Sequence, residues 1–399
     1  MSAPAADRSG EKIRVMVMLD SIHRPGGGES LAIENAIGLD PERFDRKLCL
    51  TRWSDSFEVD EPARSILARL RGAGVEVIGL RRTGRFDLRS WLHLLRVLRR
   101  ERIEVLHAHL FGSNVWASVL GRIARVPVIV AHEHMWAYTG SGSRSRALID
   151  RFVIARLSSA FIAVSRDGER QMIETEKIPA HDIVYIQNGA PGLGDGDGDR
   201  IREELGLAGK TIAGSIGHLR PEKAFEVLVE AAGLLAEEHP ELRVVIAGEG
   251  PERAGLEELA GRLGIADRVL LIGARSDVGD LLAAFDIAVC CSDFEGGPLS
   301  VMEYMEAGLP VVATRVGGLP EMVQENRTGL LVPPRDPAAL ASALGDVISD
   351  RGEAERLGDA GRGLWAERYD IRVWIGRLEA LYERLLGRTA GGQTSSSGA

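Results

Sequence analysis

One stretch in the second half of the sequence, residues 286–321, limits the possible folds more than any other. The apolar run Ile287–Cys291 is typical of a buried parallel strand, and a glycine-containing loop follows it. Pro298 suits the first position of a helix, because its missing N–H needs no partner there. Gly308 can end that helix, and a second apolar run follows at 310–314. The stretch therefore predicts a strand–loop–helix–strand unit, which is typical of an α/β fold.

Two glutamates in this unit are candidates for ligand binding. Glu295 is predicted to lie in the loop at the carboxyl end of the first strand, where open α/β sheets bind their ligands. Glu303 is predicted to lie on a mostly apolar stripe of the helix, so its carboxylate needs hydrogen-bond donors. Sugar hydroxyls could supply them. For an isolated unit, glutamates that are merely solvated or paired with arginines are an equally good interpretation.

Two segments of the second half could bind phosphate. Gly296 and Gly297 allow a ligand to approach the backbone, and the helix start that follows offers unpaired N–H groups. In the other segment, Lys223 lies at the start of the predicted helix 223–238, where a cation has the wrong sign for the helix dipole. An anion such as a diphosphate, held between Lys223 and Arg220, would explain this placement. A surface ion pair of Lys223 with a neighbouring glutamate is the structural alternative.

Glycines stand before the first predicted helix of the N-terminal half. The run 26–28 precedes a helix predicted from Glu29, and its backbone could approach a phosphate or an acceptor. A plain glycine-rich turn is the alternative. The run is not a dinucleotide-binding fingerprint, because Leu31 stands where the third glycine would be.

Four histidines follow two predicted strands closely. His107 and His109 lie on the strand predicted at 105–110, and His132 and His134 end the next one. Such a group raises the hypothesis of a metal site. No further ligand has a convincing spacing, so we predict no metal site.

Several motifs together resemble one enzyme family. In EGGPLSVME, Glu295 and Glu303 are separated by seven residues, as in the two-glutamate signature of the retaining glycosyltransferases of family four, which have the GT-B fold. PGGGE resembles the PGGxE loop of that family, HAH resembles its HxH motif, and GHLRPEKA resembles its GRLxxxKG pattern. The resemblance runs from about residue 14 to residue 388 and is stronger in the second half. It implies an α/β protein with two Rossmann-like, doubly wound domains facing across a cleft.

The resemblance also implies a role for each matched residue of the second domain. Glu303 would hold the ribose hydroxyls of the donor, and Glu295 would lie beside the transferred sugar. Lys223 would neutralise the diphosphate. Arg220 would assist it from two positions along, because His218 stands where the family has an arginine. Further donor contacts would come from Gly296, Gly297, Pro298 and Leu299.

In the first domain, the resemblance implies that His109 faces the transferred sugar and contributes to catalysis. Gly27 and Gly28 would lie beside the donor diphosphate and the acceptor. No metal or other cofactor is implied, because cationic side chains and backbone amides would serve the diphosphate.

The composition divides the chain near its middle. The segment GAPGLGDGDGDR at 189–200 is the clearest break and predicts a flexible linker. Its aspartates imitate a calcium loop, but Arg200 and Gly206 stand where that loop requires glycine and glutamate. With the resemblance, we expect an acceptor domain at 1–190, a linker at 191–205, a donor domain at 206–367, a crossover helix at 368–388 that returns to the first domain, and a disordered tail at 389–399.

The overall composition narrows the location and partners. The net charge of −9 argues against nucleic-acid binding. Cysteines are few, and neither a signal peptide nor a membrane-spanning run is evident, which favours a reducing cytoplasm. The predicted helix 88–100 is basic and amphipathic; its leucines and Trp91 are expected in the core, with contact to an anionic membrane as the alternative.

We therefore expect an enzyme of glycan biosynthesis. It would move a sugar from a nucleotide-diphosphate sugar to a saccharide or lipid-linked acceptor, with retention of anomeric configuration and without a metal. It would be cytoplasmic, or peripheral at the inner membrane face. The alternatives are a nucleotide-sugar 2-epimerase of the same fold and a noncatalytic nucleotide-sugar-binding protein. A nicotinamide-dependent oxidoreductase is disfavoured by the missing fingerprint.

Overall fold

The structure is a computed structural model that describes residues 11–23, 26–84, 87–134 and 143–387. The predicted tail at 389–399 lies outside these residues. The chain divides into two compact units. Unit 1 comprises residues 1–163, 169–186 and 374–399, and unit 2 comprises residues 164–168 and 187–373. No helix in the described residues is long and apolar enough to cross a membrane.

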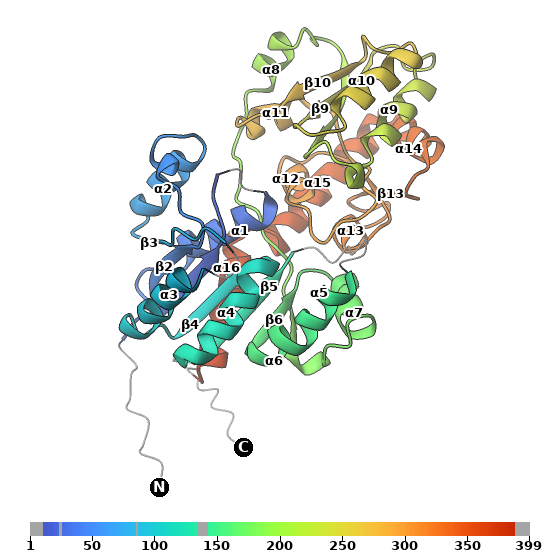
Figure 1. Ribbon diagram of the computed structural model, residues 1–399. Coiled ribbons are helices and arrows are strands. Elements are labelled where there is room, and N and C mark those ends of the chain that lie inside the picture. Colours follow the sequence, from blue (N-terminus) through green and yellow to red (C-terminus); the bar gives the residue numbers. More distant parts are fainter. Residues whose placement is uncertain (1–10, 24–25, 85–86, 135–142, 388–399) are drawn as a thin grey trace, which may run out of the picture. The chain divides into compact units, whose positions relative to one another are not determined.

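Unit 1 is built on a parallel sheet of seven strands in the order β3-β2-β1-β4-β5-β6-β7 (Figure 1). The strands are apolar along most of their length, because helices cover both faces of such a sheet. The strands are β1 Ile13–Leu19, β2 Phe44–Leu50, β3 Glu76–Gly79, β4 Val105–His109, β5 Val128–Glu133, β6 Ala160–Ala163 and β7 Ile183–Tyr185. The helices and short turns are α1 Gly27–Gly38, η1 Asp55–Glu58, α2 Ala63–Gly72, α3 Leu88–Arg100, α4 Phe111–Ala124, α5 Ser143–Ile149, η2 Asp150–Ile154, α6 Ala155–Leu157, α7 Arg166–Glu174, η3 Ala180–Asp182 and α16 Ile371–Leu385, with α7 and α16 beginning in unit 2.

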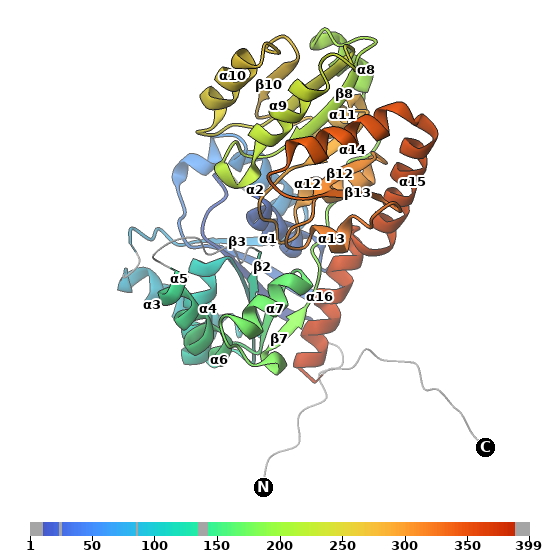
Figure 2. The same cartoon turned by 90° about the vertical axis from the view of Figure 1, so that its right-hand side faces the viewer.

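Unit 2 repeats this plan with six parallel strands in the order β10-β9-β8-β11-β12-β13 (Figure 2). One apolar cluster lies under α9, α10 and α14, and another lies under α8, α11, α12 and α15. The strands are β8 Thr211–Ile216, β9 Leu242–Ala247, β10 Val269–Gly273, β11 Ile287–Cys290, β12 Val311–Thr314 and β13 Gly329–Val332. The helices are α8 Gly198–Glu204, η4 Pro221–Lys223, α9 Phe225–Leu234, α10 Arg253–Arg262, α11 Val278–Ala284, α12 Leu299–Glu306, α13 Leu319–Met322, α14 Pro337–Ser349 and α15 Arg351–Arg368.

Each sheet reverses its strand order at one point, between β1 and β4 in unit 1 and between β8 and β11 in unit 2. Loops that leave the carboxyl ends of two such strands diverge to opposite sides of the sheet and leave a crevice for ligands. The topology alone therefore predicts a ligand site between β1 and β4 in unit 1 and another between β8 and β11 in unit 2.

Helix α16 is the crossover helix of the chain. Its residues from Trp374 onward pack in unit 1, where the Glu379 carboxylate accepts hydrogen bonds from Arg43 Nη1 at 2.7 Å and from the backbone N–H of Asp40 at 2.8 Å. The Tyr382 hydroxyl, which is completely buried, donates to Asn35 Oδ1 at 3.2 Å. The helix therefore supplies polar side chains to the interior of unit 1.

The segment predicted as a flexible linker is instead packed structure. Its last part forms helix α8, with Asp197 capping the backbone N–H of Arg200 at 3.0 Å. A Cβ atom on Gly196 would lie 2.2 Å from the Gly279 carbonyl oxygen, and one on Gly198 would lie 2.3 Å from the Ala283 carbonyl oxygen. Glycine is required here for close contact of two backbones rather than for flexibility, and composition alone cannot separate these two uses.

Candidate functional site

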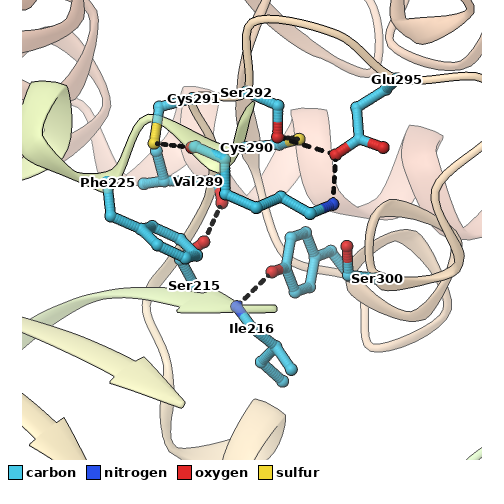
Figure 3. A pocket seen from close by; sticks show the side chains of 11 residues that line it. Ser215, Ile216, Phe225, Val289, Cys290, Cys291, Ser292, Glu295 and Ser300 are labelled. Carbon is cyan, nitrogen blue, oxygen red and sulfur yellow. Dashed lines mark hydrogen bonds and ion pairs between the residues drawn. The ribbon is translucent and has the colours of Figure 1, made fainter. Parts of the chain in front are cut away.

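The carboxyl edge of the unit 2 sheet brings together Lys223, from the turn after β8, and Glu295, from the loop after β11. Lys223 Nζ donates to Glu295 Oε1 at 2.6 Å, and Ser292 Oγ donates to the same oxygen at 2.7 Å. Figure 3 shows the carboxylate of Glu295 turned toward Ser292 at one side of the pocket. Glu295 is only 8% exposed, so these two donors are what makes its burial tolerable.

The ion pair controls the charge of the lysine. Burial alone would lower the pKa of Lys223, but the neighbouring Glu295 carboxylate holds that pKa above its ordinary value. Lys223 is therefore a cation at any physiological pH. Ala224, which follows it, has a left-handed backbone with φ of 50°, and this turn directs the chain from η4 into α9.

Arg220, the second predicted phosphate ligand, lies in the same turn but is placed differently. Its side chain is 58% exposed, and its ion-pair contact is a long one of 4.0 Å to Glu222. His218, which stands in the position of the family arginine, is also exposed. The turn after β8 thus offers one half-buried cation, Lys223, and one exposed cation, Arg220.

The glycine loop after β11 is shaped by a second loop, which follows β12. A Cβ on Gly317 would lie 2.0 Å from the Glu295 carbonyl oxygen, and one on Gly318 would lie 2.0 Å from the Gly296 carbonyl oxygen. The Gly318 N–H also donates to the Glu295 carbonyl oxygen at 2.9 Å. Backbone packing on both sides therefore determines where Glu295 and Gly296 lie.

The loop leaves its amide donors available at the start of α12. Helix α12 begins at Leu299, one residue later than predicted. Pro298, which was expected at the first helical position, is instead the N-cap and has an extended backbone. Gly297 accepts a hydrogen bond from Asn188 Nδ2 at 3.2 Å through its carbonyl oxygen. Within the part of the chain that the structure describes, the N–H groups of Gly296, Gly297 and Leu299 have no acceptor. Such a set of donors can bind an anion.

Glu303 lies one turn into α12 and has no ion pair or hydrogen bond to its carboxylate from the described residues. Burial, with a smaller contribution from the charge of Glu306, raises the pKa of Glu303 to about 7. A half-neutral carboxyl group that lacks donors is well prepared to accept hydrogen bonds from ligand hydroxyls.

In unit 1, the predicted glycines lie inside helix α1 rather than in a loop before it. The helix begins at Gly27, two residues before the predicted start at Glu29. A Cβ on Gly28 would lie 2.7 Å from Leu110 Cδ2 and 3.0 Å from His134 Cδ2. The first turn of α1 therefore packs directly on residues that follow β4 and β5, and only glycine leaves room for this.

His109, which the HxH motif predicts to face the transferred sugar, lies in the interior of unit 1. It is completely buried. Its Nε2 lies 3.2 Å from Asn35 Nδ2, and its Nδ1 lies 3.0 Å from His134 Nε2. Both ring nitrogens are therefore used inside the protein, by partners that are distant in the sequence.

The histidines are close together but poorly arranged for a metal. Ring nitrogens of His107, His109 and His132 lie within 4.8 Å of one another. Their rings are stacked, with interplanar angles of 17° between His107 and His109 and 15° between His107 and His132. A metal must lie in the plane of each ligating ring at about 2.0–2.1 Å from nitrogen, and planes stacked in this way do not meet at such a point.

The sequence-based interpretation missed a polar cluster at the unit 1 switch point. Asp20 Oδ1 accepts hydrogen bonds from Thr51 Oγ1 at 2.5 Å and from Arg82 Nη2 at 3.0 Å. The Arg82 side chain is 4% exposed and lies against the Trp91 ring. Asp20 directly follows β1, Thr51 directly follows β2 and Arg82 lies three residues after β3, so polar residues after neighbouring apolar runs are the signal that could have identified the cluster.

Two family models match adjacent parts of the chain. The model described as Glycosyltransferase Family 4 matches residues 25–191, and the model described as Glycosyl transferases group 1 matches residues 197–364. The matches together take in β4 of unit 1 and both strands of the unit 2 switch point, whereas β1 precedes the first match. They meet between residues 191 and 197, inside the segment where the composition changes.

Individual proteins resemble the chain over most of its length. An alpha-D-kanosaminyltransferase from Streptomyces kanamyceticus is 27% identical over 316 residues, which are 74% of this chain and 82% of the relative. A UDP-Gal:alpha-D-GlcNAc-diphosphoundecaprenol alpha-1,3-galactosyltransferase from Escherichia coli is 26% identical over 279 residues, 66% of this chain and 71% of the relative. The crystal structure of Anabaena Alr3699/HepE in complex with UDP has a TM-score of 0.80 and 22% identity, over 93% of this chain and 100% of that chain.

Glu303→Gln should stabilise the protein in a pH-dependent way. Since burial raises the pKa of Glu303 from 4.5 to about 7, the folded state binds more protons between these values, and stability falls as pH rises through them. Removing the carboxylate should raise the free energy of unfolding more at pH 8 than at pH 5, by about 2 kcal/mol. Urea denaturation at both pH values measures this.

Glu237→Gln is the matched control, because Glu237 is an exposed glutamate of the same unit. Its substitution should change stability by less than about 0.5 kcal/mol at either pH. Equal stabilisation by Glu303→Gln at pH 5 and pH 8 would contradict the uncompensated burial of this carboxylate.

Proposed function

We propose that the chain moves a sugar from a nucleotide-diphosphate sugar to a saccharide or lipid-linked acceptor with retention of configuration. The chain belongs to the family 4 glycosyltransferases of group 1, which have the GT-B fold. The observation that carries the proposal is the edge of the unit 2 sheet. There the half-buried Lys223, the buried Glu295, the partly buried Glu303 and backbone amides without an acceptor among the described residues lie around one switch point. A ligand that is anionic at one part and rich in hydroxyls at another matches this arrangement.

The donor would be divided among these groups by its chemistry. Glu303 would accept hydrogen bonds from the ribose hydroxyls. Lys223, Arg220 and the N–H groups of Gly296, Gly297 and Leu299 would bind the diphosphate. Negative charge grows on that diphosphate as the glycosidic bond breaks, so donors that are already in place stabilise the transition state most. No metal is needed in this proposal, because the cations and amides serve the leaving group.

Donor binding would also rearrange the ion pair between Lys223 and Glu295. Without donor, Lys223 is held by Glu295 at 2.6 Å. A diphosphate carries more negative charge than one carboxylate and would draw Lys223 toward itself. Glu295 would then accept hydrogen bonds from the transferred sugar and stabilise positive charge at its anomeric carbon.

The acceptor would bind at the switch point of unit 1. Asp20 is held by Thr51 and Arg82 through one oxygen, while its side chain is 35% exposed, so the other oxygen can accept a hydrogen bond from an acceptor hydroxyl. The name of the Escherichia coli relative specifies a lipid-linked acceptor. Both saccharide and lipid-linked acceptors therefore belong in the assay.

The nucleotide is identified by thermal stability in the presence of UDP, GDP, ADP and their hexose conjugates, since ligand that binds the folded state raises the melting temperature. One nucleotide should give a shift. Its conjugate is then offered with saccharide and lipid-linked acceptors, and Lys223→Ala should lower turnover roughly a hundredfold, the scale for loss of one electrostatic stabiliser.

The outcomes separate the candidate functions. Consumption of donor with release of an epimer and no acceptor would identify a 2-epimerase, and a shift without turnover would identify a binding protein. A product of inverted anomeric configuration, read by proton NMR, would refute retention. Near-normal turnover of Lys223→Ala would refute the diphosphate assignment.

Glu295→Gln should separate binding from turnover. Freed from its carboxylate partner, Lys223 becomes fully available to phosphate, so the affinity for the nucleoside diphosphate should rise roughly threefold to tenfold. Turnover should fall at least about tenfold, because the sugar loses its carboxylate. Calorimetric titration and initial rates measure the two quantities.

Asp293→Asn is the control for a general charge effect, because Asp293 lies in the same loop but pairs with Arg335. It should leave the affinity within about twofold of the original. An unchanged affinity in Glu295→Gln would show that the ion pair does not compete with phosphate.

We also propose a cytoplasmic location with peripheral membrane contact through α3. The helix buries Trp91 and Leu98 as expected, but Leu88 and Leu92, which were expected in the core, are 69% and 50% exposed. Exposed arginines accompany them at positions 89, 96, 99 and 100. Apolar and cationic side chains together suit an anionic lipid surface.

Sedimentation with phosphatidylglycerol vesicles tests this contact. The full chain should sediment with the vesicles, and the double substitution Leu88→Ser and Leu92→Ser should reduce the bound fraction severalfold. Leu234→Ser is the control, since Leu234 is 61% exposed but lies in unit 2. Equal loss in both variants, or no sedimentation of the original protein, would refute the role of α3.

A further inference from the structure

The two central strands of the unit 2 sheet separate before they end. Strands β8 and β11 are paired at Ala213 with Ile287 and at Gly214 with Ala288. Beyond these pairs, the last two residues of β8 stay paired with β9, and the last two of β11 stay paired with β12. The sheet therefore opens at the switch point, and the backbone groups that face this gap need other hydrogen-bond partners.

A tyrosine hydroxyl supplies one of these partners. The Gly217 N–H donates to the carbonyl oxygen of Ala247 on β9 at 3.0 Å, so the N–H of Ile216, which points to the opposite side of the strand, faces the gap. This N–H donates to the hydroxyl of Tyr304 on α12 at 2.7 Å. Tyr304 thus takes the place that a carbonyl group of a neighbouring strand would have.

A serine hydroxyl supplies the other partner and closes the network. Ser215 Oγ donates to the carbonyl oxygen of Val289 on β11 at 2.7 Å, and Ser215 also hydrogen-bonds the Tyr304 hydroxyl. Because Ser215 gives its one proton to Val289, Tyr304 is the donor in the bond between the two hydroxyls. Burial raises the pKa of Tyr304, so its hydroxyl keeps the proton that this bond requires. The bonds thus cross the gap from β8 to β11, and the dashed lines at Ile216 and Ser215 in Figure 3 mark the first and the last of them.

The network lies beneath the candidate donor site and is closed to a ligand. Tyr304 is 1% exposed, and Ser215 is 3% exposed. The small cavity that these two residues line together with Lys223 and Glu295 measures about 10 Å³, roughly the room of one water molecule. A diphosphate is larger than this cavity, so Tyr304 can act on it through the residues that it holds, but not by contact.

The end of β8 supports the aliphatic part of Lys223. A Cβ on Gly217 would lie 3.7 Å from Lys223 Cε and 3.9 Å from Lys223 Cδ, so the lysine stem lies over the residue that follows Ile216. The other end of the hydrogen bond is α12, where Glu303 directly precedes Tyr304. One hydroxyl therefore joins the strand end under the cation to the helix that carries the second glutamate.

We propose that Tyr304 is a positioning residue of the donor site: its hydroxyl holds the end of β8 against α12 and thereby places Lys223 for the diphosphate. The identity of the ligand as a nucleotide-diphosphate sugar rests on the proposed function. The support of β8 by the hydroxyl does not depend on that function, and it can be measured in the protein without any ligand.

The support of the strand is tested first, by hydrogen exchange of backbone amides followed by NMR. In the unmodified chain the Ile216 N–H should be protected. In Tyr304→Phe, which keeps the buried ring and removes the hydroxyl, it should exchange at least about tenfold faster, because it has lost its acceptor. The Val244 N–H of β9, which donates to the Arg268 carbonyl oxygen at 2.8 Å, is the internal control and should keep its rate. An unprotected Ile216 N–H in the unmodified chain, or an equal rise at both amides in the variant, would overturn the proposal.

A double-mutant cycle tests whether Tyr304 acts through Lys223. The probe is whichever of UDP, GDP and ADP raises the melting temperature, and its affinity is measured by calorimetric titration. Tyr304→Phe should weaken this affinity roughly tenfold in the original chain but less than about twofold in Lys223→Ala, because the cation that Tyr304 places is then absent. A general loss of stability would instead weaken binding by the same factor in both backgrounds, and that result would refute the positioning role.

Two further variants complete the test. Tyr369→Phe is the matched control, because Tyr369 is a completely buried tyrosine of the same unit whose hydroxyl donates to the Glu321 carbonyl oxygen at 3.1 Å. It should leave the affinity within about twofold of the original. Ser215→Ala shortens the same network and should weaken the affinity in the same direction, which keeps the test decisive if Tyr304→Phe does not fold. If none of the three nucleotides bound the unmodified protein, the proposed function would fail, while the exchange rate of the Ile216 N–H would still decide the role of Tyr304 at the strand.

Discussion

The chemistry of unit 2 depends on the ion pair between Lys223 and Glu295. A carboxylate that is 8% exposed is tolerated only with donors, and here they are one ammonium group and the Ser292 hydroxyl. The pair keeps two opposite charges at a sheet edge before any donor arrives. A negatively charged group of a ligand can take the place of Glu295 beside Lys223, and ligand hydroxyls can take the place of Lys223 beside Glu295. The ion pair therefore stabilises the site and can exchange its internal contact for contacts with a ligand.

The second glutamate shows the opposite arrangement. Glu303 is partly buried on α12 without compensating donors from the described residues, and burial raises its pKa to about 7. The two carboxylates of one motif thus differ in their partners, since Glu295 has two donors and Glu303 has none among the described residues. The unpaired group lowers the stability of the folded chain at neutral pH. A loss of stability of this kind is common at sites whose polar groups are arranged for a ligand.

Local sequence patterns were sufficient for the architecture of both units. Apolar runs of strand length, helix punctuation at Pro298 and Gly308, and alternation of strands with helices lead to two parallel sheets, and the family models and the solved structures agree with this fold. Lys223 and Glu295 also meet, because each follows a strand beside the same switch point. Chain topology alone brings such residues together.

The errors have a common physical origin in contacts between distant segments. Gly196 was interpreted as flexible, yet its missing side chain makes room for the backbone of α11. The contacts of the two His109 ring nitrogens with Asn35 and His134 were likewise not evident from the HxH motif. A motif reveals which residue types are present near a strand end, but it does not reveal which hydrogen-bonding groups a helix from elsewhere in the chain supplies. Tyr382, which orients Asn35 from 347 positions away, is the clearest case.

The two switch points also differ in how they achieve precision. In unit 2, glycine backbones pack against each other and hold the loop of Glu295 and Gly296 in place, so the charged side chains can respond to a ligand while the loop stays rigid. In unit 1, Asn35 of α1 instead contacts the buried His107 and His109 rings of β4 through its side-chain amide. A sugar needs directional hydrogen bonds more than it needs charge, whereas a diphosphate needs both. The carboxyl edge of each sheet has the kind of group that its proposed ligand requires.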